Sequence, residues 1–307
     1  MTYAGTGPSG IQTLFQTDGQ SIPLFKLKSQ TKVLSVGKDT SVEFSSIKTA
    51  VDSVVDSSSS NRYFIDVGPG TYVEGAIVLP TYVNIRGTPG STVIVPSDNN
   101  SPLISMSGIN FISSIELFTP SNSIGLISTN GAITNIDRLL FFGPNIGIKL
   151  DTGTTIVGTE VVFNYLSTGT SGICILSDNV TSAIFSTVQI VNADVGIRAS
   201  SGKFTLTNYT IKNTDIGVIV GGDTISDLRL GNIDTCQTGI CVLSNTVPDF
   251  RLIVSDTDIR NSVINDFETR AMSGIVNVTS SSFSQDKLVV TNFDTINMVI
   301  FDEKEGE

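Results

Sequence analysis

The sequence predicts an all-β fold, a right-handed parallel β-helix with an N-terminal capping α-helix. Two observations carry this prediction: a glycine that recurs in phase along the chain, and an alternating strand ahead of each of these glycines. The composition agrees with it, because Val, Ile, Ser, Thr, Asn and Gly are abundant and only 15% of the 307 residues are charged.

The recurring glycine sets the length of one coil. From residue 120 onward, a glycine followed by an apolar residue recurs at intervals of 21 to 25 residues. These glycines are Gly125, Gly147, Gly172, Gly196, Gly217 and Gly239. Short strands fill each interval and leave no room for a crossover helix, so a solenoid that turns once per repeat is the fold expected. Gly274 follows 35 residues after Gly239, an interval longer than the others, which predicts an insertion or a slipped frame in that coil.

The phase of the repeat predicts which side chains face outward. Strands have a period of two, so residues one and three positions after each glycine should face the core and the residue between them should face out. The residues predicted to face outward are Ile127, Lys149, Cys174, Arg198, Ile219 and Cys241. Four of these, Ile127, Cys174, Ile219 and Cys241, predict an apolar outer stripe that either a loop of the same chain or a second subunit covers.

Disulfide bonds are not expected. The chain has three cysteines, too few for a disulfide framework. On the predicted outer face, Cys174 and Cys241 lie three coils and about 14 Å apart, which is too far for a bridge.

The N-terminal third is expected to contain an arm and a helix. Residues 1–35 are polar and rich in Gly, Thr, Ser and Gln, which predicts an extended arm or linker. Apolar residues then recur at helical spacing, which predicts a cap helix over about 43–55 with Ser45 or Ser46 at its N-cap.

The segment 33–95 resembles the N-terminal part of pectinesterase-like and other pectin-lyase-like β-helix proteins. The matching residues are Val36-Gly37-Lys38, Phe44 to Val51, Phe64 to Glu74 around Gly68-Pro69-Gly70, Val83 to Gly87 and Thr92 to Val95. The resemblance implies that the helix caps the open N-terminal end of the coils and that the solenoid extends over 36–300. Pectinesterases carry a Gly-Thr-Val-Asp-Phe-Ile-Phe-Gly segment with the nucleophile, a Gln-Asp pair and an Arg-Pro-Trp segment. None of these occurs here, so an activity of that type is not expected.

A looser resemblance concerns the arm. A glycine-rich polar arm before a β-helix, with no export signal, is similar to tail-spike, tail-fibre and vertex proteins of viruses and phages. No secretory signal and no apolar run long enough for a transmembrane helix occur in the sequence. This resemblance implies a location on a virion, outside the host after lysis. The charged residues of 301–307 separately predict an end that is exposed to solvent.

The charge balance excludes some partners. The formal net charge is −11, with no basic face to neutralise phosphate, so nucleic acid and anionic membrane surfaces are not expected as partners. Membrane insertion is not expected either, because the sequence has no long apolar run. The chain contains no histidine, which removes the commonest general base and the commonest metal ligand.

Asp194 and Asp215 are the candidate site residues. They occupy the same position in adjacent coils, within Asn192-x-Asp194-x-Gly196 and Asn213-x-Asp215-x-Gly217. This phase places the two residues about 5 Å apart along the solenoid. Such carboxylates bind calcium, share a proton for catalysis, or satisfy local backbone groups before a turn, and all three interpretations stay open. No other metal or cofactor is expected.

The sequence therefore predicts a non-enzymatic structural or attachment protein of a virion, of the tail-spike, fibre or vertex type. We expect a homo-oligomer, with a trimer favoured, that contacts other virion proteins through its arm and also contacts surface glycans. Two alternatives stay open: a polysaccharide lyase or glycoside hydrolase built on the β-helix, and a bacterial surface adhesin.

Overall fold

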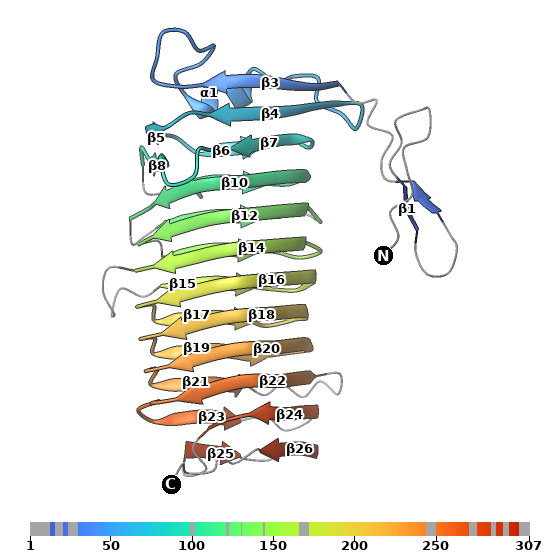
Figure 1. Cartoon of the computed structure of the whole chain (residues 1–307), viewed down its shortest axis with the longest axis vertical. Helices are drawn as coiled ribbons and strands as arrows, with labels where there is room; N and C mark the ends of the chain where they lie inside the picture. The colour runs from blue at the N-terminus through green and yellow to red at the C-terminus, as the bar shows by residue number, and fades with distance from the viewer. Residues whose placement is uncertain are drawn as a thin grey trace.

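The computed structural model describes residues 13–15, 21–23, 30–98, 102–120, 123–129, 131–143, 145–165, 172–243, 250–269, 275–283, 287–290 and 295–300. These residues form a parallel β-solenoid of about nine turns with almost no helix (Figure 1), which confirms the predicted fold class. The charged end 301–307 and most of the expected arm lie outside the described residues.

Two parallel sheets build the solenoid, and in Figure 1 their strands stack along the long axis of the molecule. The main path of the larger sheet is β3 (Gln30–Val36), β4 (Asn61–Val67), β7 (Val83–Arg86), β10 (Ile109–Phe118), β12 (Ile133–Phe142), β14 (Thr155–Asn164), β16 (Val180–Val191), β18 (Gly202–Lys212), β20 (Thr224–Asp234), β22 (Arg251–Arg260), β24 (Ile275–Ser281) and β26 (Thr295–Ile300). Beside this path, β5 (Gly70–Glu74) pairs with β8 (Thr92–Pro96), and β8 pairs with β10. Each coil from β10 onward contributes one long strand to this sheet.

The smaller sheet contains one short strand from each coil. Its strands are β6 (Ile77–Leu79), β9 (Ile104–Met106), β11 (Ile124–Ser128), β13 (Ile146–Leu150), β15 (Ile173–Ser177), β17 (Val195–Ala199), β19 (Ile216–Gly221), β21 (Thr238–Leu243), β23 (Asn265–Thr269) and β25 (Leu288–Val290). Outside the solenoid, β1 (Thr13–Phe15) and β2 (Ser21–Pro23) form an antiparallel pair.

Each long strand bends at one residue with a left-handed backbone. The residues with φ between 49° and 58° at this bend are Ser114, Arg138, Glu160, Thr187, Asn208, Leu230, Asp256 and Ser280. They align in register from β10 to β24. The bend divides the outer surface of the larger sheet into two faces, which we call the pre-bend face and the post-bend face.

The interior is a continuous apolar core. Leu126, Ile148, Ile197 and Val218, each one residue after a repeat glycine, are fully buried, which confirms that part of the predicted phase. The Phe141 and Phe163 rings of adjacent coils stack with their centroids 4.8 Å apart. Such ladders of apolar side chains bury each coil against the next.

The repeat glycines are required by this close packing at two corners in particular. A Cβ at Gly147 would lie 2.4 Å from Phe163 Cε1, and one at Gly217 would lie 2.5 Å from the Gly239 carbonyl oxygen. Gly274 is outside the described residues, and Asp266 takes the place of the glycine in the coil after Gly239. The frame of the repeat has therefore slipped there.

The cap helix α1 spans Ile47–Asp52 and is shorter than the 43–55 expected. Ser46 is its N-cap, as predicted. The helix starts late because Phe44 pairs with Val36 of β3 as an isolated parallel bridge, and the residues before Phe44 form turns and bends. Figure 1 shows α1 at the N-terminal end of the stack, where its Ile47, Ala50 and Val51 side chains are buried.

The solenoid begins earlier than the expected boundary at residue 36. Strand β3 starts at Gln30 and pairs in parallel with β4 along its whole length. The polar composition of this segment hid the strand, because its outward side chains face solvent. In the described part of the chain, no helix is long and apolar enough to cross a membrane.

Candidate functional site

Asp194 and Asp215 lie in adjacent coils at the turn before β17 and β19, as the repeat phase predicted. The Ile216 amide donates to the Asp194 carbonyl at 2.9 Å, which stacks the two turns. The Asp215 carboxylate accepts a hydrogen bond from the Gln237 side-chain amide of the following coil at 2.8 Å. The described residues contain no group of three or more acidic or cysteine side chains placed to hold a metal ion. The geometry therefore supports a role in tying adjacent turns together.

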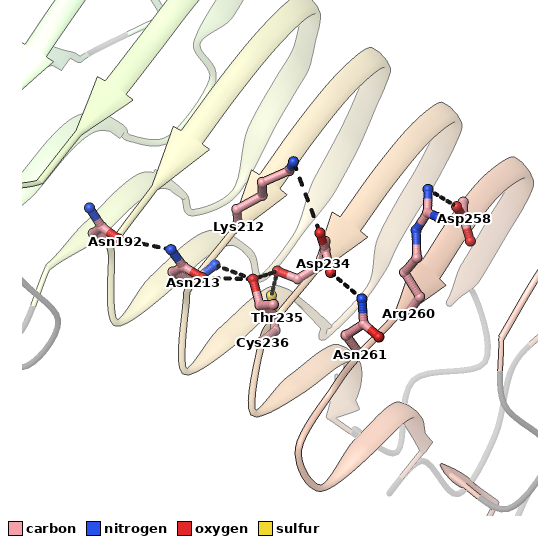
Figure 2. Close-up of polar contacts among 9 residues, drawn as sticks. All are labelled: Asn192, Lys212, Asn213, Asp234, Thr235, Cys236, Asp258, Arg260 and Asn261. Carbon is pink, nitrogen blue, oxygen red and sulfur yellow. Dashed lines mark hydrogen bonds and ion pairs between the residues drawn. The ribbon is translucent and has the colours of Figure 1, made fainter.

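A ladder of polar side chains runs beside these turns, one per coil (Figure 2). Asn192, Asn213, Thr235 and Asn261 all have a left-handed backbone, a conformation that asparagine tolerates better than most residues. The Asn213 amide donates to Asn192 Oδ1 at 3.3 Å, and the Thr235 hydroxyl donates to Asn213 Oδ1 at 2.7 Å. The Asn261 amide continues the ladder to Asp234 Oδ1 at 2.8 Å. These side-chain hydrogen bonds connect successive coils and stabilise the stack.

The charged side chains around the ladder are paired with one another. Lys212 lies 3.9 Å from Asp234, and Arg260 lies 2.5 Å from Asp258 (Figure 2). Both carboxylates therefore form ion pairs within the chain.

The predicted outer stripe is wrong at Cys174. The register aligns Ile173 with Ile146 and Ile175 with Ile148, so Cys174 takes the place of the repeat glycine and is fully buried. Gly172 precedes the strand and is not the repeat glycine, because this coil is longer than its neighbours. Burial raises the pKa of the Cys174 thiol.

The remaining stripe residues share the outer row of the smaller sheet with charged residues. That row reads Ile127, Lys149, Leu176, Arg198, Ile219, Cys241 and Glu268. Ile219 and Cys241 are buried, and Ile127 is half-buried. No disulfide links the cysteines. The stripe that the sequence predicted is therefore interrupted by charges and largely covered.

Sequence reasoning missed a polar row that runs the length of the pre-bend face, next to the bend. In register, this row reads Ser35, Asp66, Arg86, Ser113, Asp137, Thr159, Ser186, Thr207, Arg229, Ser255 and Thr279. Every one of these residues is polar. The signal was present in the sequence, but it appears only after the long strands are aligned.

The N-terminal end of this row opens into a hollow of about 360 Å³. Its polar lining comes from Ser35, Asp66, Arg86 and Thr88, and its remaining lining is Val36, Val42, Val67, Gly68 and Gly87. Strands β3, β4 and β7 position the first three polar residues in one row.

The hollow contains a paired guanidinium and carboxylate. Arg86 Nε and Nη2 donate to the two oxygens of Asp66 at 2.9 Å each, and this pair raises the pKa of Arg86. The guanidinium carbon also lies 6.0 Å from the Phe64 ring centroid. Such a pair presents remaining donors and acceptors side by side, an arrangement that suits a ligand with neighbouring hydroxyl groups.

A second cluster lies beside the first coils. Lys32 Nζ lies 2.8 Å from the Tyr63 hydroxyl and 3.2 Å from Asp56, and the Tyr63 hydroxyl donates to the same carboxylate. The hydrogen bond with Tyr63 is the largest cause of the raised pKa of Lys32 and of the lowered pKa of Asp56. The hydrogen bond between Lys32 and Asp56 is the second cause of both shifts. The cluster joins the loop after α1 to β3 and β4.

Comparison with known proteins shows the fold and nothing finer. No family model matches the chain, and no curated protein matches it in sequence. A PL6 family alginate lyase is similar in structure, with a TM-score of 0.59 and 10% identity over 94% of this chain and 47% of the lyase. The chain thus spans about half the length of that enzyme.

Two further solved structures have related coils. The tailspike protein of an Acinetobacter phage aligns with a TM-score of 0.52 and 13% identity over 97% of this chain and 66% of the tailspike. A pectin methylesterase in complex with a hexasaccharide aligns with a TM-score of 0.42 and 13% identity over 84% of this chain and 92% of the esterase. All three are parallel β-helix proteins, the fold class expected from residues 33–95.

Proposed function

We propose that this chain is a non-enzymatic structural or attachment protein of a virion surface that binds glycans in the hollow at its N-terminal coils. The observation that carries the proposal is the Arg86–Asp66 pair, placed with the Ser35 and Thr88 hydroxyls around one hollow. Hydroxyl-rich ligands are bound by such mixed donors and acceptors.

The residues that line the hollow do not favour glycoside hydrolysis. Glycoside hydrolysis ordinarily uses two carboxyl groups, one on each side of the bond. Among the described lining residues, Asp66 is the one carboxylate, and Arg86 holds both of its oxygens. The site therefore suits binding without bond cleavage.

The fold is compatible with the attachment role and with its main alternative, because a phage tailspike and an alginate lyase are both similar in structure. The identities of 13% and 10% support the fold alone, so the choice between the two rests on the site residues.

Binding to a panel of immobilised neutral and acidic polysaccharides tests the proposal. We expect Arg86→Ala to weaken binding at least about tenfold, because it removes a charge-assisted hydrogen-bonding group. Arg229→Ala is the matched control, since Arg229 forms an equivalent exposed pair with Asp227 outside the hollow. Equal loss in both variants would contradict the hollow as the binding site.

An assay for cleavage separates the alternatives. The same polysaccharides are incubated with the full chain and assayed for new reducing ends and for unsaturated uronate. Release of either product, abolished by an Asp66→Asn substitution, would establish a polysaccharide-degrading enzyme instead. Detection of the chain in purified virions by mass spectrometry would support the virion assignment over a bacterial surface adhesin.

A further inference from the structure

The pre-bend face carries a concentration of exposed aliphatic side chains. Ile109, Ile133, Val157, Ile184, Ile225 and Ile275 are each between 38% and 50% exposed. They come from β10, β12, β14, β16, β20 and β24, and all point out of one sheet. Solvated strands usually place polar residues at such positions, so this face is unusually apolar for a surface in water.

The cross-strand register places these side chains in two neighbouring outward rows of one face. Ile109 pairs directly with Ile133, and Val157 pairs with Ile184. Ile225 aligns with Arg251, which aligns with Ile275. The polar row lies next to the bend, Val157 and Ile184 lie in the middle outward row, and Ile109, Ile133, Ile225 and Ile275 lie in the row farthest from the bend.

The charge on this face is opposite to that of the whole chain. In the two outward rows from β10 to β24 that lie farther from the bend, the described charged side chains are Lys203, Arg251 and Asp227. Asp227 is held by Arg229 at 2.6 Å. The chain as a whole has a net charge of −11, so two copies repel each other over most of their surfaces. The two rows lack the excess of carboxylates that causes this repulsion elsewhere on the chain.

The dimensions of the face fit an interface of modest size. At about 4.8 Å per strand and about 3.3 Å per residue, the face from β10 to β24 measures about 34 Å by 17 Å, or about 600 Å². Two such faces would bury about 1,200 Å² in total, which is at the lower limit of specific interfaces. Association through this face should therefore be reversible and dependent on concentration.

We propose that the pre-bend face between β10 and β24 binds a second copy of this chain. A second copy is the occupant that fits, because it presents the same flat face, the same strand spacing and the same low density of carboxylates. This interface differs from the one predicted on the smaller sheet. It also leaves the hollow at β3, β4 and β7 outside the contact, so it does not depend on the proposed glycan binding.

Sedimentation equilibrium of the full chain over a wide range of concentrations tests the proposal. We expect a monomer that passes to a dimer as concentration rises. The double variant Ile133→Asp/Ile184→Asp should raise the dissociation constant about 100-fold, because both buried aliphatic contacts are lost and carboxylates are added. Val78→Asp is the matched control, since Val78 is an exposed strand residue of the smaller sheet and should leave the association unchanged.

A labelling experiment covers the case in which the charged variants fail to fold. The three native cysteines are buried, so a thiol introduced by Ile133→Cys reports on this face alone. Its reaction with a maleimide should slow as protein concentration rises, while that of Val78→Cys should stay constant. A monomer at every concentration, or equal labelling of both thiols throughout, would overturn the proposal.

Discussion

The Tyr209 hydroxyl lies 3.2 Å from the Thr257 hydroxyl, two coils further along the solenoid, and both side chains are buried. Between them, Gly231 of β20 pairs directly with Tyr209 on one side and with Thr257 on the other. A Cβ at Gly231 would lie 2.1 Å from Tyr209 Cζ, so the tyrosine ring reaches Thr257 only because this residue has no side chain. Three successive coils are thereby linked through the core.

Gly231→Ala should destabilise the protein strongly. The new methyl group would overlap the Tyr209 ring, and overpacking of a dense core costs about 3 kcal/mol. The free energy of unfolding, measured by denaturant titration, checks this. Gly75→Ala is the control, because a Cβ there would meet its neighbours at ordinary distances of 3.7 Å and 3.8 Å. Similar losses in both variants would rule out the steric explanation.

Glu74→Gln should loosen the cap helix. The buried Glu74 carboxylate accepts hydrogen bonds from the Ile47 amide at 2.7 Å, the Lys48 amide at 3.2 Å and the Ser46 hydroxyl at 2.8 Å. An amide nitrogen in place of one oxygen would face these donors, at an expected loss of about 2 kcal/mol. Hydrogen exchange at α1 and thermal unfolding would report the change, and Glu43→Gln at an exposed position should leave both as in the wild type.

The Lys32–Tyr63–Asp56 cluster should make stability depend on pH at both ends of the scale. The pKa of Asp56 is lowered below its ordinary 3.8 by hydrogen bonds from Tyr63 and Lys32. Its contribution is therefore present above that value and is lost as the pH falls through the folded pKa. The pKa of Lys32 is raised above 10.5 by the same partners, so its contribution is present below 10.5 and is lost as the pH rises through the folded pKa.

Tyr63→Phe should flatten both limbs of this profile, because it removes the largest single cause of each pKa shift. Unfolding midpoints measured from acid to alkaline pH would reveal it. Tyr82→Phe keeps the ring that Arg62 overlies at 5.3 Å and should retain the wild-type profile. A Tyr63→Phe profile with the same slopes as the wild type would contradict this assignment.

The native protein should be inert to thiol reagents. Burial raises the pKa of Cys174 and of Cys236, whose Sγ also lies 3.1 Å from the Thr214 hydroxyl, and Cys241 is buried as well. Few thiolates form under these conditions, and the reagent has little access to them. Titration with a chromogenic disulfide should detect no thiol in the folded protein and three after unfolding. Rapid reaction of one thiol in the folded state would show that its coil opens.

The sequence alone was sufficient for the fold, because a solenoid repeats one local solution. Glycines recur where backbones of adjacent coils approach closely, and the apolar residue after each one packs against its counterpart in the next coil. The same local regularity placed Asp194 and Asp215 in adjacent turns. Ser46 at the N-cap was also predictable, since capping depends on residues within one helical turn.

What only the tertiary structure decided was the alignment between coils of unequal length. An insertion shifts the frame without changing the motif, and for that reason Gly172 appeared to be a repeat glycine while Cys174 actually takes that place in the core. The bend in each long strand is likewise absent from any local pattern, because residues as different as Arg138, Leu230 and Asp256 adopt it. The apolar pre-bend face depends on that bend and that alignment, and the polar row and the hollow around Arg86 and Asp66 depend on the alignment. They bring together residues that are separated by a whole coil or more in the sequence, and contacts at that separation are set by packing between strands.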